Sequence, residues 1–469
     1  MNGCGTTNGS GPTDSCGATN AGGPTNGGDR RGRAPGRPHA PVTVVELDLD
    51  DPGEVRSPGG RGPADPDGRV SALVRLHGHP LGMVHATGTS GRPGALARAL
   101  VAAAHRELPV PARSTAVPAA GHSRTERDRA RAERPTVSVV VPTHNRPGTL
   151  RRCLDTLLRS PYPHYEVLVV DNAPADDRAR RLIDDHYRDR VRYLCEPVTG
   201  LARARNRGLA AARGELTAFA DDDLLVDAAW IDALADAFAE DPAIGCVTGL
   251  VLPAELDTPA QRALEQYGGY ARGYRARTWS LAADDDPLLR FSVGRCGSGA
   301  NMAFRTRLLR SLGGFDPATG AGTPARGGEE LLAFHRVLAA GAAIAYQPDA
   351  IVWHPHPRTD DELAHQVYNF GVGFGAYLTA AVTHRPATLV PLVRRLPRGL
   401  WQWEAARRAR AGTRSDGPAP VAGPQHLGRR ELCGLLYGPL GYLISVRRQR
   451  AVDRHAQAVG ATAAGGGQR

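Results

Sequence analysis

Three short runs of mostly apolar residues constrain the fold of this chain more than any other feature. They occupy residues 137–141, 166–170 and 216–220, and β-branched side chains are frequent in the first two. A strand that is apolar on both sides must be covered on both faces, as in the parallel sheets of α/β proteins. Segments with helical spacing separate the runs, at residues 150–158, 177–187 and 202–212. Strands that alternate with helices in this way predict a mostly parallel sheet with helices on both faces.

Each of the three predicted strands ends on polar residues. The first leads into Pro142-Thr143-His144-Asn145, the second into Asp171-Asn172 and the third into Asp221-Asp222-Asp223. Because the carboxyl ends of parallel strands meet at one edge of a sheet, where ligands bind in open α/β folds, these residues predict a ligand cleft.

The triple acid allows two interpretations. Asp221 and Asp223 are two residues apart, and on extended chain such residues point the same way. Their carboxylates could therefore face one hard cation such as Mg²⁺ or Mn²⁺, which suits a substrate with a diphosphate leaving group. Alternatively, the acids cap a helix expected over residues 226–238, since Asp is favourable at helix N-termini.

The composition argues against several classes of protein. All 58 Lys and Arg residues are arginine and the formal net charge is +10. The arginines form no DNA- or RNA-binding motif, so no nucleic-acid partner is expected. The seven cysteines lack metal-binding spacing, which is typical of reduced thiols in a cytoplasmic protein. No apolar stretch reaches the roughly 18 residues of a membrane span, and the polar N-terminus is unlike a signal peptide.

The chain has 469 residues, enough for two or three domains. Residues 1–40 and 448–469 have few large apolar side chains, and both tails are predicted to be disordered. Residues 41–110 predict a small α/β module of open role, with strands at 42–47, 70–76 and 80–84 and a helix at 96–108. The remainder divides into a linker at 111–134, the main α/β domain at 135–358 and a helical region at 359–447.

Eight motifs of the main domain occur in an order that resembles one known family. They are Val-Val-Val-Pro-Thr-His-Asn-Arg (139–146), Val-Leu-Val-Val-Asp-Asn (167–172), Ala-Arg-Asn-Arg-Gly-Leu (204–209), Phe-Ala-Asp-Asp-Asp (219–223), Gly-Ala-Asn-Met-Ala-Phe-Arg (299–305), Gly-Gly-Phe-Asp (313–316), Gly-Gly-Glu-Glu (327–330) and Val-Trp-His (352–354). Together they resemble the family 2 glycosyltransferases, which have a GT-A fold. The expected fold is thus a GT-A type, Rossmann-like, mostly parallel sheet, with the N-terminal module and the helical C-terminal region added to it.

The resemblance implies an inverting enzyme that needs Mg²⁺ or Mn²⁺ and moves a sugar from a nucleotide-sugar to an acceptor hydroxyl. The expected donors are UDP-, dTDP- or GDP-sugars. A glycan, as in polysaccharide biosynthesis, a lipid-linked glycan and a secondary metabolite all remain open as acceptors. One alternative is a non-catalytic nucleotide-sugar-binding protein of the same fold. A sugar-phosphate nucleotidyltransferase is disfavoured, because the Gly-rich, Lys-containing signature of that class is absent.

The resemblance also implies roles for individual residues. The donor would contact Pro142, Thr143, Asn145, Asp171, Arg205, Asp221 and Asp222. The metal ligands would be Asp223, with Asp221 and His354 as further candidates; His356 is a weaker substitute.

The catalytic base would be Glu330, with Glu329 beside it, where the family usually has Glu-Asp. Glu329 would raise the pKa of Glu330, whereas the start of a helix would lower it, and the sequence leaves the balance open.

Two features of the C-terminal region need separate interpretation. Gly371 and Gly375 resemble a dinucleotide loop only superficially, and are expected to permit close packing of helices. Residues 394–414 mix arginines with Leu396, Leu400, Trp401 and Trp403. That mixture allows peripheral contact with an anionic membrane at its inner face, although an exposed helix of an arginine-rich protein would look similar.

Overall fold

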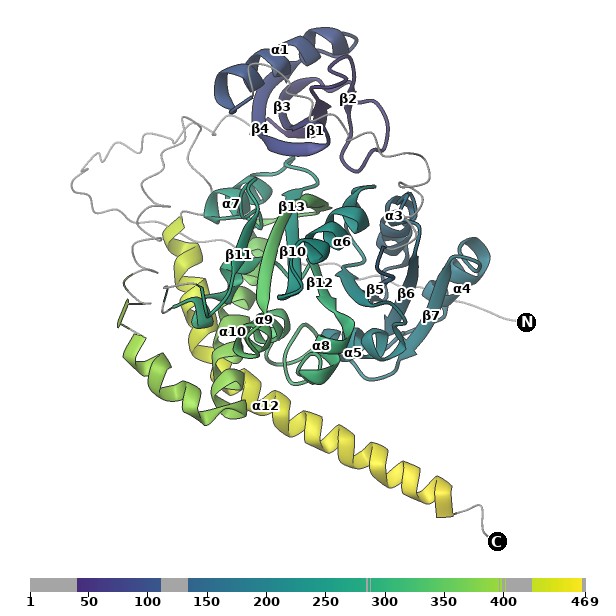
Figure 1. The fold of residues 1–469 in the computed structure, drawn as a ribbon, viewed down its shortest axis with the longest axis vertical. Coiled ribbons are helices and arrows are strands. Elements are labelled where there is room, and N and C mark those ends of the chain that lie inside the picture. Colours follow the sequence, from purple (N-terminus) through teal and green to yellow (C-terminus); the bar gives the residue numbers. More distant parts are fainter. Residues whose placement is uncertain are drawn as a thin grey trace, which may run out of the picture. The chain divides into compact units, whose positions relative to one another are not determined.

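The computed structural model describes residues 40–110, 134–283, 286, 288–395, 397–398, 401 and 424–465 (Figure 1). The predicted disordered N-terminal tail and the predicted linker at 111–134 lie outside these residues, apart from residues 40 and 134. No helix in the described part of the chain is both long and apolar enough to cross a membrane. The cysteines of the described residues, at positions 153, 195, 246, 296 and 433, form no disulfide with one another.

The N-terminal module is a four-stranded sheet with one helix. Its strands have the order β2-β1-β3-β4, and its elements are β1 (Val42–Asp48), β2 (Val55–Arg56), β3 (Gly68–Leu76), β4 (His79–Gly88) and α1 (Pro93–Glu107). The hairpin β3–β4 turns at His77 and Gly78, both of which have positive φ. Buried residues of β1, β3 and α1, including Val45, Ala72 and Leu100, form a core of their own.

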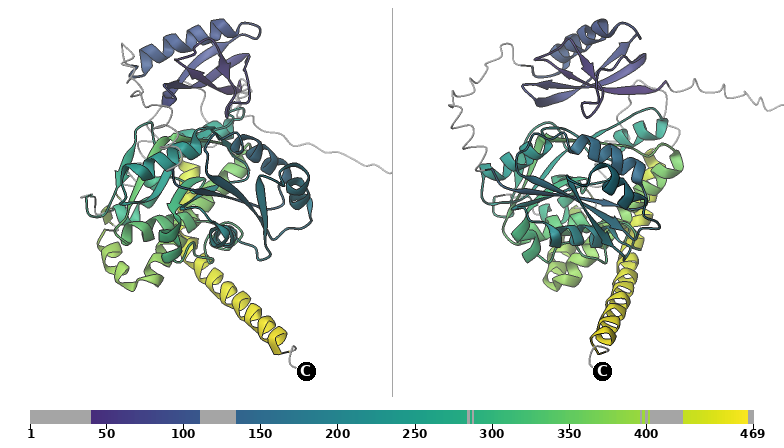
Figure 2. Two further views of the ribbon diagram at one scale, coloured as in Figure 1. Left: turned by 45° about the vertical axis from the view of Figure 1, so that its right-hand side comes forward. Right: turned by 90° about the vertical axis from the view of Figure 1, so that its right-hand side faces the viewer.

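A nine-stranded sheet organises the main domain (Figure 2). Its order is β11-β13-β10-β12-β8-β5-β6-β7, and β9 pairs with β13. The strands are β5 (Val137–Thr143), β6 (Tyr165–Asn172), β7 (Val191–Glu196), β8 (Leu216–Ala220), β9 (Leu225–Val226), β10 (Ile244–Pro253), β11 (Arg277–Trp279), β12 (Asn301–Arg305) and β13 (Ala343–His354). The pairings give β5, β6, β7, β8, β10 and β13 one direction, and β9, β11 and β12 the opposite one. The predicted mostly parallel sheet is therefore confirmed.

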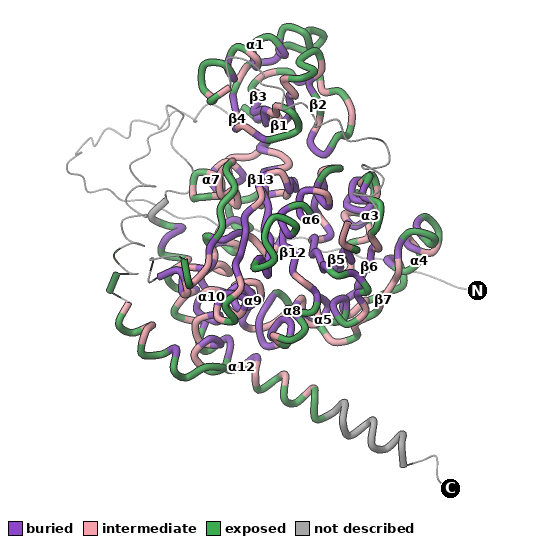
Figure 3. The backbone as a smooth tube through the Cα atoms, viewed as in Figure 1, coloured by how far each residue is buried: buried purple, intermediate pink, exposed green. Residues whose placement is uncertain are grey.

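Helices cover both faces of this sheet. Alternate residues of a strand point to opposite faces, and accordingly Val140 belongs to one apolar core while Val139 and Val141 belong to another. The helices of the main domain are α3 (Pro147–Leu157), α4 (Arg178–His186), α5 (Leu201–Ala211), α6 (Trp230–Glu240), α7 (Pro259–Tyr267), α8 (Thr306–Ser311) and α9 (Glu329–Ala339), with 3-10 turns η1 (Leu289–Phe291) and η2 (Val293–Cys296). Figure 3 shows the buried residues concentrated along the strands and the helix sides that meet them. The expected α/β fold with two covered faces is confirmed.

Two long helices follow the main domain. They are α10 (Asp360–His384) and α12 (Pro424–Gly465), with the 3-10 turn η3 (Pro386–Thr388) after α10. A side chain at Gly371 would lie 2.0 Å from the Glu431 carbonyl oxygen of α12, and one at Gly375 would lie 2.5 Å from that of Leu435. Only glycine permits this approach, so the prediction that these glycines pack helices is confirmed, and the dinucleotide-loop interpretation is wrong.

Three element boundaries differ from the sequence-based expectation. The helix expected over residues 226–238 begins only at Trp230, because Leu225 and Val226 pair with Trp353 and Val352 of β13. The two short strands expected at 344–346 and 350–353 form one strand, β13, which accommodates an irregular register opposite Gly249. Helix α12 continues to Gly465, past residue 447, because residues 448–465 are rich in the good helix formers Ala, Arg and Gln.

Candidate active site

The polar ends of neighbouring strands meet as predicted. Thr143 ends β5, Asp171 is the last residue but one of β6, and Asp221 directly follows β8, while β5 pairs with both other strands. The Thr143 hydroxyl donates a 2.7 Å hydrogen bond to Asp222 Oδ2. One edge of the sheet therefore carries a hydroxyl and several carboxylates, which can bind a polar ligand.

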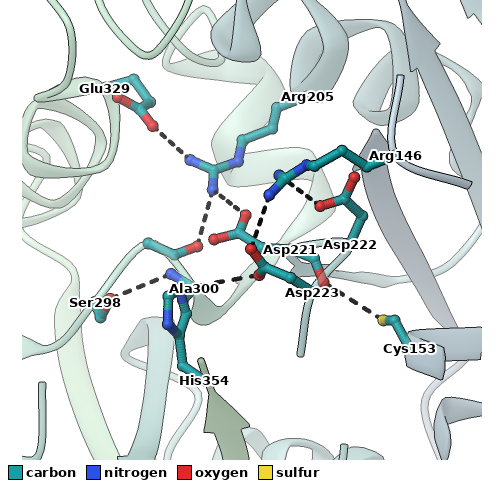
Figure 4. Close-up of polar contacts among 11 residues, drawn as sticks. Arg146, Cys153, Arg205, Asp221, Asp222, Asp223, Ser298, Ala300, Glu329 and His354 are labelled. Atoms are coloured by element: carbon teal, nitrogen blue, oxygen red, sulfur yellow. Dashed lines mark hydrogen bonds and ion pairs between the residues drawn. The ribbon is translucent and has the colours of Figure 1, made fainter. Parts of the chain in front are cut away.

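The three acids pair with two arginines, Arg146 and Arg205 (Figure 4). The chain turns at Asp222 and Asp223 instead of continuing extended, so the alternation rule for strands does not apply to these side chains. Asp221 Oδ1 accepts a hydrogen bond from Arg205 at 3.1 Å. Asp222 Oδ1 and Asp223 Oδ2 lie 2.6 and 3.0 Å from the Arg146 guanidinium. Asp221 and Asp223 therefore have different arginine partners, and a cation shared by the two carboxylates stays a prediction. Helix α6 begins only at Trp230, so the three acids lie too far before it in the chain to cap it.

Two of the three predicted metal ligands converge. His354, the last residue of β13, brings its Nε2 to 3.9 Å from Asp223 Oδ1, and that oxygen is buried without a hydrogen-bond partner among the described residues. Within the same residues, no three His, Cys, Asp or Glu side chains are placed to share a metal ion. Asp223 and His354 fit a divalent cation that takes its other ligands from substrate phosphates and water, as Mg²⁺ commonly does.

His356 is excluded as a substitute ligand in this arrangement. Its side chain is fully buried, and its Nε2 lies 2.7 Å from Glu265 Oε1 of α7. This contact ties the end of β13 to α7, so the role of His356 is structural.

One carboxylate oxygen of Asp171 has no hydrogen-bond partner among the described residues. The Tyr193 hydroxyl donates to Oδ2 at 3.0 Å, whereas Oδ1 is buried with no hydrogen-bond partner in the described part of the chain. Burial raises the pKa of Asp171 despite that hydrogen bond. A buried acceptor without a partner suits an N–H donor of a bound ligand, and this agrees with the predicted nucleobase contact.

The other residues predicted to contact the donor lie at the end of β5 and in the loop that follows it. Pro142 is buried within the strand, and Asn145 takes a positive φ of 57°. Asn145 Oδ1 accepts a hydrogen bond from the Ala175 backbone at 2.9 Å, so it fixes this loop to the segment after β6. His144 contacts the Asn172 carbonyl oxygen through Nδ1 at 2.6 Å.

Arg205 connects the acids of the strand end to the predicted base. It is 1% exposed, and its Nη1 donates to Glu329 Oε1 at 2.9 Å, while Nη2 donates to Asp221 Oδ1 and to the Gly299 carbonyl oxygen. Predicted as a donor contact, Arg205 instead uses both terminal nitrogens to join α5, the end of β8 and the start of α9. The buried Arg205 guanidinium therefore holds Asp221 and Glu329 beside each other.

Glu330 differs from Glu329 in its electrostatic environment. Gly328, with φ of 88°, begins α9, and Glu329 and Glu330 occupy its first turn. Glu329 is paired with Arg205, whereas burial and the nearby charge of Glu329 raise the pKa of Glu330. For the pKa of Glu330, burial and repulsion by Glu329 therefore outweigh the lowering effect of the helix start. A carboxyl group with a raised pKa is well matched to accepting a proton near neutral pH.

Two residues of the site were not predicted. Arg146 was present in the first motif, and its place three residues after Thr143 is the signal that could have identified it. Tyr270 had no sequence signal: its ring lies 5.1 Å from that of His354, centroid to centroid, and its hydroxyl accepts a hydrogen bond from Gln366 of α10 at 3.1 Å. Burial and the charge of Asp221 raise the pKa of Tyr270.

Replacement of Arg205 by Met should destabilise the protein strongly. The variant leaves the buried Glu329 carboxylate and Asp221 without their shared cation, and losing one partner of a buried ion pair costs about 3–5 kcal/mol. Arg207→Met is the matched control, since Arg207 is exposed on the same helix and should change the free energy of unfolding by less than about 0.5 kcal/mol. Urea unfolding measures both; equal losses would contradict the linking role of Arg205.

Asp222 should make stability depend on pH. Burial raises its pKa from 3.8 to about 6. The folded state therefore holds this proton more tightly than the unfolded state, and the associated stabilisation is full below 3.8 and lost as the pH rises to about 6. Relative to Asp222→Asn, the free energy of unfolding of the wild type should fall by up to about 3 kcal/mol over this range. A pH-independent difference between the two proteins in urea unfolding would contradict the raised pKa.

Comparisons with known proteins agree with this site. Residues 138–312 match the family model described as glycosyl transferase family 2. The pre-mycofactocin glycosyltransferase of Mycobacterium tuberculosis is 30% identical over 266 residues, which are 55% of this chain and 50% of that protein. The uncharacterized glycosyltransferase EpsJ of Bacillus subtilis is 35% identical over 104 residues, 22% of this chain and 30% of that protein. This chain therefore spans half or less of the length of these two relatives.

A solved structure also matches in part. It is the mannosyltransferase PcManGT from Pyrobaculum calidifontis in complex with GDP-Man and Mn²⁺, with a TM-score of 0.40 and 22% identity, covering 71% of this chain and 81% of that one. The family match includes β5, β6, β8 and the acids that follow β8. Residues 138–312 of this chain therefore belong to glycosyl transferase family 2.

Proposed function

We propose that this protein is an inverting, metal-dependent glycosyltransferase that moves a sugar from a nucleotide-sugar to an acceptor hydroxyl. The observation that carries the proposal is the buried Arg205, which holds Asp221 of the strand end and Glu329 of α9 on one guanidinium. A candidate donor site and a candidate base therefore lie beside each other. Sugar transfer needs this arrangement, because the leaving diphosphate and the attacking hydroxyl lie on opposite sides of one carbon.

The donor would bind along the ends of β5, β6 and β8. Asp171 offers its unpartnered Oδ1 to an N–H group of the nucleobase, and Thr143 and Asp222 would line the pocket beside it. Arg146 is 53% exposed, and its guanidinium lies on Asp222 and Asp223. The exposed part of its guanidinium can therefore contact a bound diphosphate.

Asp223 and His354 would hold the Mg²⁺ or Mn²⁺ ion. A cation bound there would supply Lewis-acid stabilisation to the leaving diphosphate. Arg146, which pairs with the other carboxylate oxygen of Asp223, would also stabilise the negative charge of the leaving diphosphate. His354 ends β13 and Asp223 lies in the turn between β8 and β9, which fixes the positions of both proposed ligands relative to the donor.

Glu330 would act as the general base. The acceptor oxygen forms a bond to the anomeric carbon while the bond from that carbon to the diphosphate oxygen breaks. The acceptor proton passes to the Glu330 carboxylate, and the nucleoside diphosphate leaves. A single displacement of this kind inverts the anomeric configuration. The raised pKa of Glu330 favours this role, because the base is then strong enough to take the proton near neutral pH.

Ligand-induced thermal stabilisation tests the donor class. UDP-, dTDP- and GDP-sugars should be screened with and without Mn²⁺, and one donor class should raise the melting temperature more with the metal. A ligand at 100 times its Kd stabilises the folded state by about 2.7 kcal/mol. Asp171→Asn should weaken the shift, since it exchanges an acceptor oxygen for a donor. If none of the three classes shifts the melting temperature, the proposed donor site is wrong.

A further inference from the structure

Helix α12 has one long apolar side that faces solvent. Its other side packs against α10, where side chains at Gly434 and Gly438 would collide with the carbonyl oxygens of Tyr368 and Val372. The solvent side carries four leucines, here called the leucine face: Leu432, Leu436, Leu440 and Leu443, which are 39, 74, 55 and 51% exposed. Spacings of four, four and three residues place them on one face of a helix.

Arginines stand at both ends of the leucine face. Arg429 precedes Leu432 by three residues and Arg447 follows Leu443 by four, so both lie on the same side of the helix, and both are exposed. Between residues 426 and 454, the acidic residues of α12 are Glu431 and Asp453. Each of them contacts a residue of the main domain. The Tyr267 hydroxyl donates to Glu431 at 2.5 Å, and Asp453 pairs with Arg203 at 2.9 Å. The leucine face is therefore apolar in the middle and cationic at its ends.

We propose that the leucine face of α12 binds the surface of a membrane that contains anionic phospholipid. A helix of this pattern lies in the membrane plane, with its apolar side in the boundary between headgroups and acyl chains and its basic residues near the phosphates. Among the described residues, no helix is long and apolar enough to cross a membrane. The inference stands on α12 alone and does not depend on the proposed sugar transfer.

A second segment has the same character. Leu389, Val390 and Val393, which follow η3, are 49, 56 and 58% exposed, and Arg394 and Arg395 come next in the chain. Trp401 is 71% exposed. Arg394, Arg395 and Trp401 belong to the segment 394–414, which the sequence alone suggested as a membrane contact; Leu396, Leu400 and Trp403 of that segment lie outside the described residues.

Charge favours a membrane over a second copy of this chain as the partner. Two copies joined through their leucine faces in antiparallel fashion would bring Arg429 of one against Arg447 of the other. A parallel arrangement would bring each arginine against its own equivalent. Both arrangements place like charges together at each end of the contact, whereas anionic phosphates complement them.

Sedimentation with vesicles tests the proposal on the full-length protein. The vesicles contain phosphatidylcholine alone or phosphatidylcholine mixed with phosphatidylglycerol, and each is used at low and at high salt. The test variant is Leu436→Glu with Leu440→Glu, two exposed positions four residues apart. The matched control is Ala95→Glu with Ala99→Glu, which adds the same charge at the same spacing on exposed positions of α1. Circular dichroism and melting temperature verify that both variants are folded.

The wild type and the α1 control should sediment with the mixed vesicles at low salt, and much less with phosphatidylcholine alone. The leucine variant should bind at least about tenfold more weakly, because it loses apolar insertion and gains repulsion from the lipid. Equal binding of the leucine and α1 variants, or no binding by the wild type, would overturn the proposal. A concentration-dependent dimer that only the leucine variant abolishes, without vesicle binding, would assign the face to self-association instead.

Discussion

Glu330→Gln should lower the rate of sugar transfer by about 10²–10⁴-fold, the usual contribution of a positioned general base. The amide keeps the size of the side chain but cannot accept the proton of the acceptor hydroxyl. Because the pKa of Glu330 is raised by burial and by Glu329, the neutral amide also resembles the protonated form of the side chain. The variant should therefore fold and bind donor as the wild type does. Transfer kinetics and a thermal shift with the donor measure the two properties separately.

Two further variants make the Glu330 result specific. Glu330→Asp restores the residue that the family usually has at this position, and it should retain activity. Glu329→Gln should instead lower stability, because Glu329 shares Arg205 with Asp221 in the interior. Normal transfer by Glu330→Gln would remove the residue from the base role. Glu329 would then become the candidate, since its carboxylate lies in the same helical turn.

Asp223→Ala should reduce metal-dependent donor turnover by more than about a hundredfold. The change removes a proposed metal ligand, and Lewis-acid stabilisation of a leaving phosphate contributes several kcal/mol, with each 1.4 kcal/mol worth about tenfold in rate. The fold should persist, because Asp223 pairs with Arg146, whose side chain is 53% exposed, and such pairs contribute about 0–1 kcal/mol. Release of nucleoside diphosphate with added Mn²⁺ measures the loss.

The control for Asp223 is Asp177→Ala, which removes an exposed acid at the start of α4 and should leave turnover unchanged. The melting temperatures of both variants should stay close to that of the wild type. Near-normal activity of Asp223→Ala that EDTA still abolishes would mean that the metal is held by other groups.

Local patterns in the sequence predicted much of the fold. The apolar runs that became β5, β6 and β8 have buried neighbours on both faces, and that requirement can be read from the residue types alone. Gly371 and Gly375 were identified as helix contacts because no strand precedes them. The positions of Thr143, Asp171 and Asp221 followed from one rule, that parallel strands carry their carboxyl ends to one edge.

Local sequence patterns could not predict the contacts between distant segments of the chain. The turn at Asp222 and Asp223 is followed by Leu225 and Val226, which pair with residues of β13 more than 120 positions later in the chain. Arg205 gave no sign that its partners would be Glu329 and Asp221, because arginine is so abundant here. Tyr270 reaches the site only because it packs against His354 and α10.

Donor turnover measures the central claim most directly. The purified protein is incubated with each nucleotide-sugar and Mn²⁺, with and without EDTA, and nucleoside diphosphate, free sugar and nucleotide-sugar are quantified over time. The account predicts that one donor class is consumed, that nucleoside diphosphate appears in equal amount, and that EDTA and Asp223→Ala both stop the reaction. A donor that raises the melting temperature but remains intact, even with candidate acceptors added, would identify a binding protein and contradict the proposed catalysis.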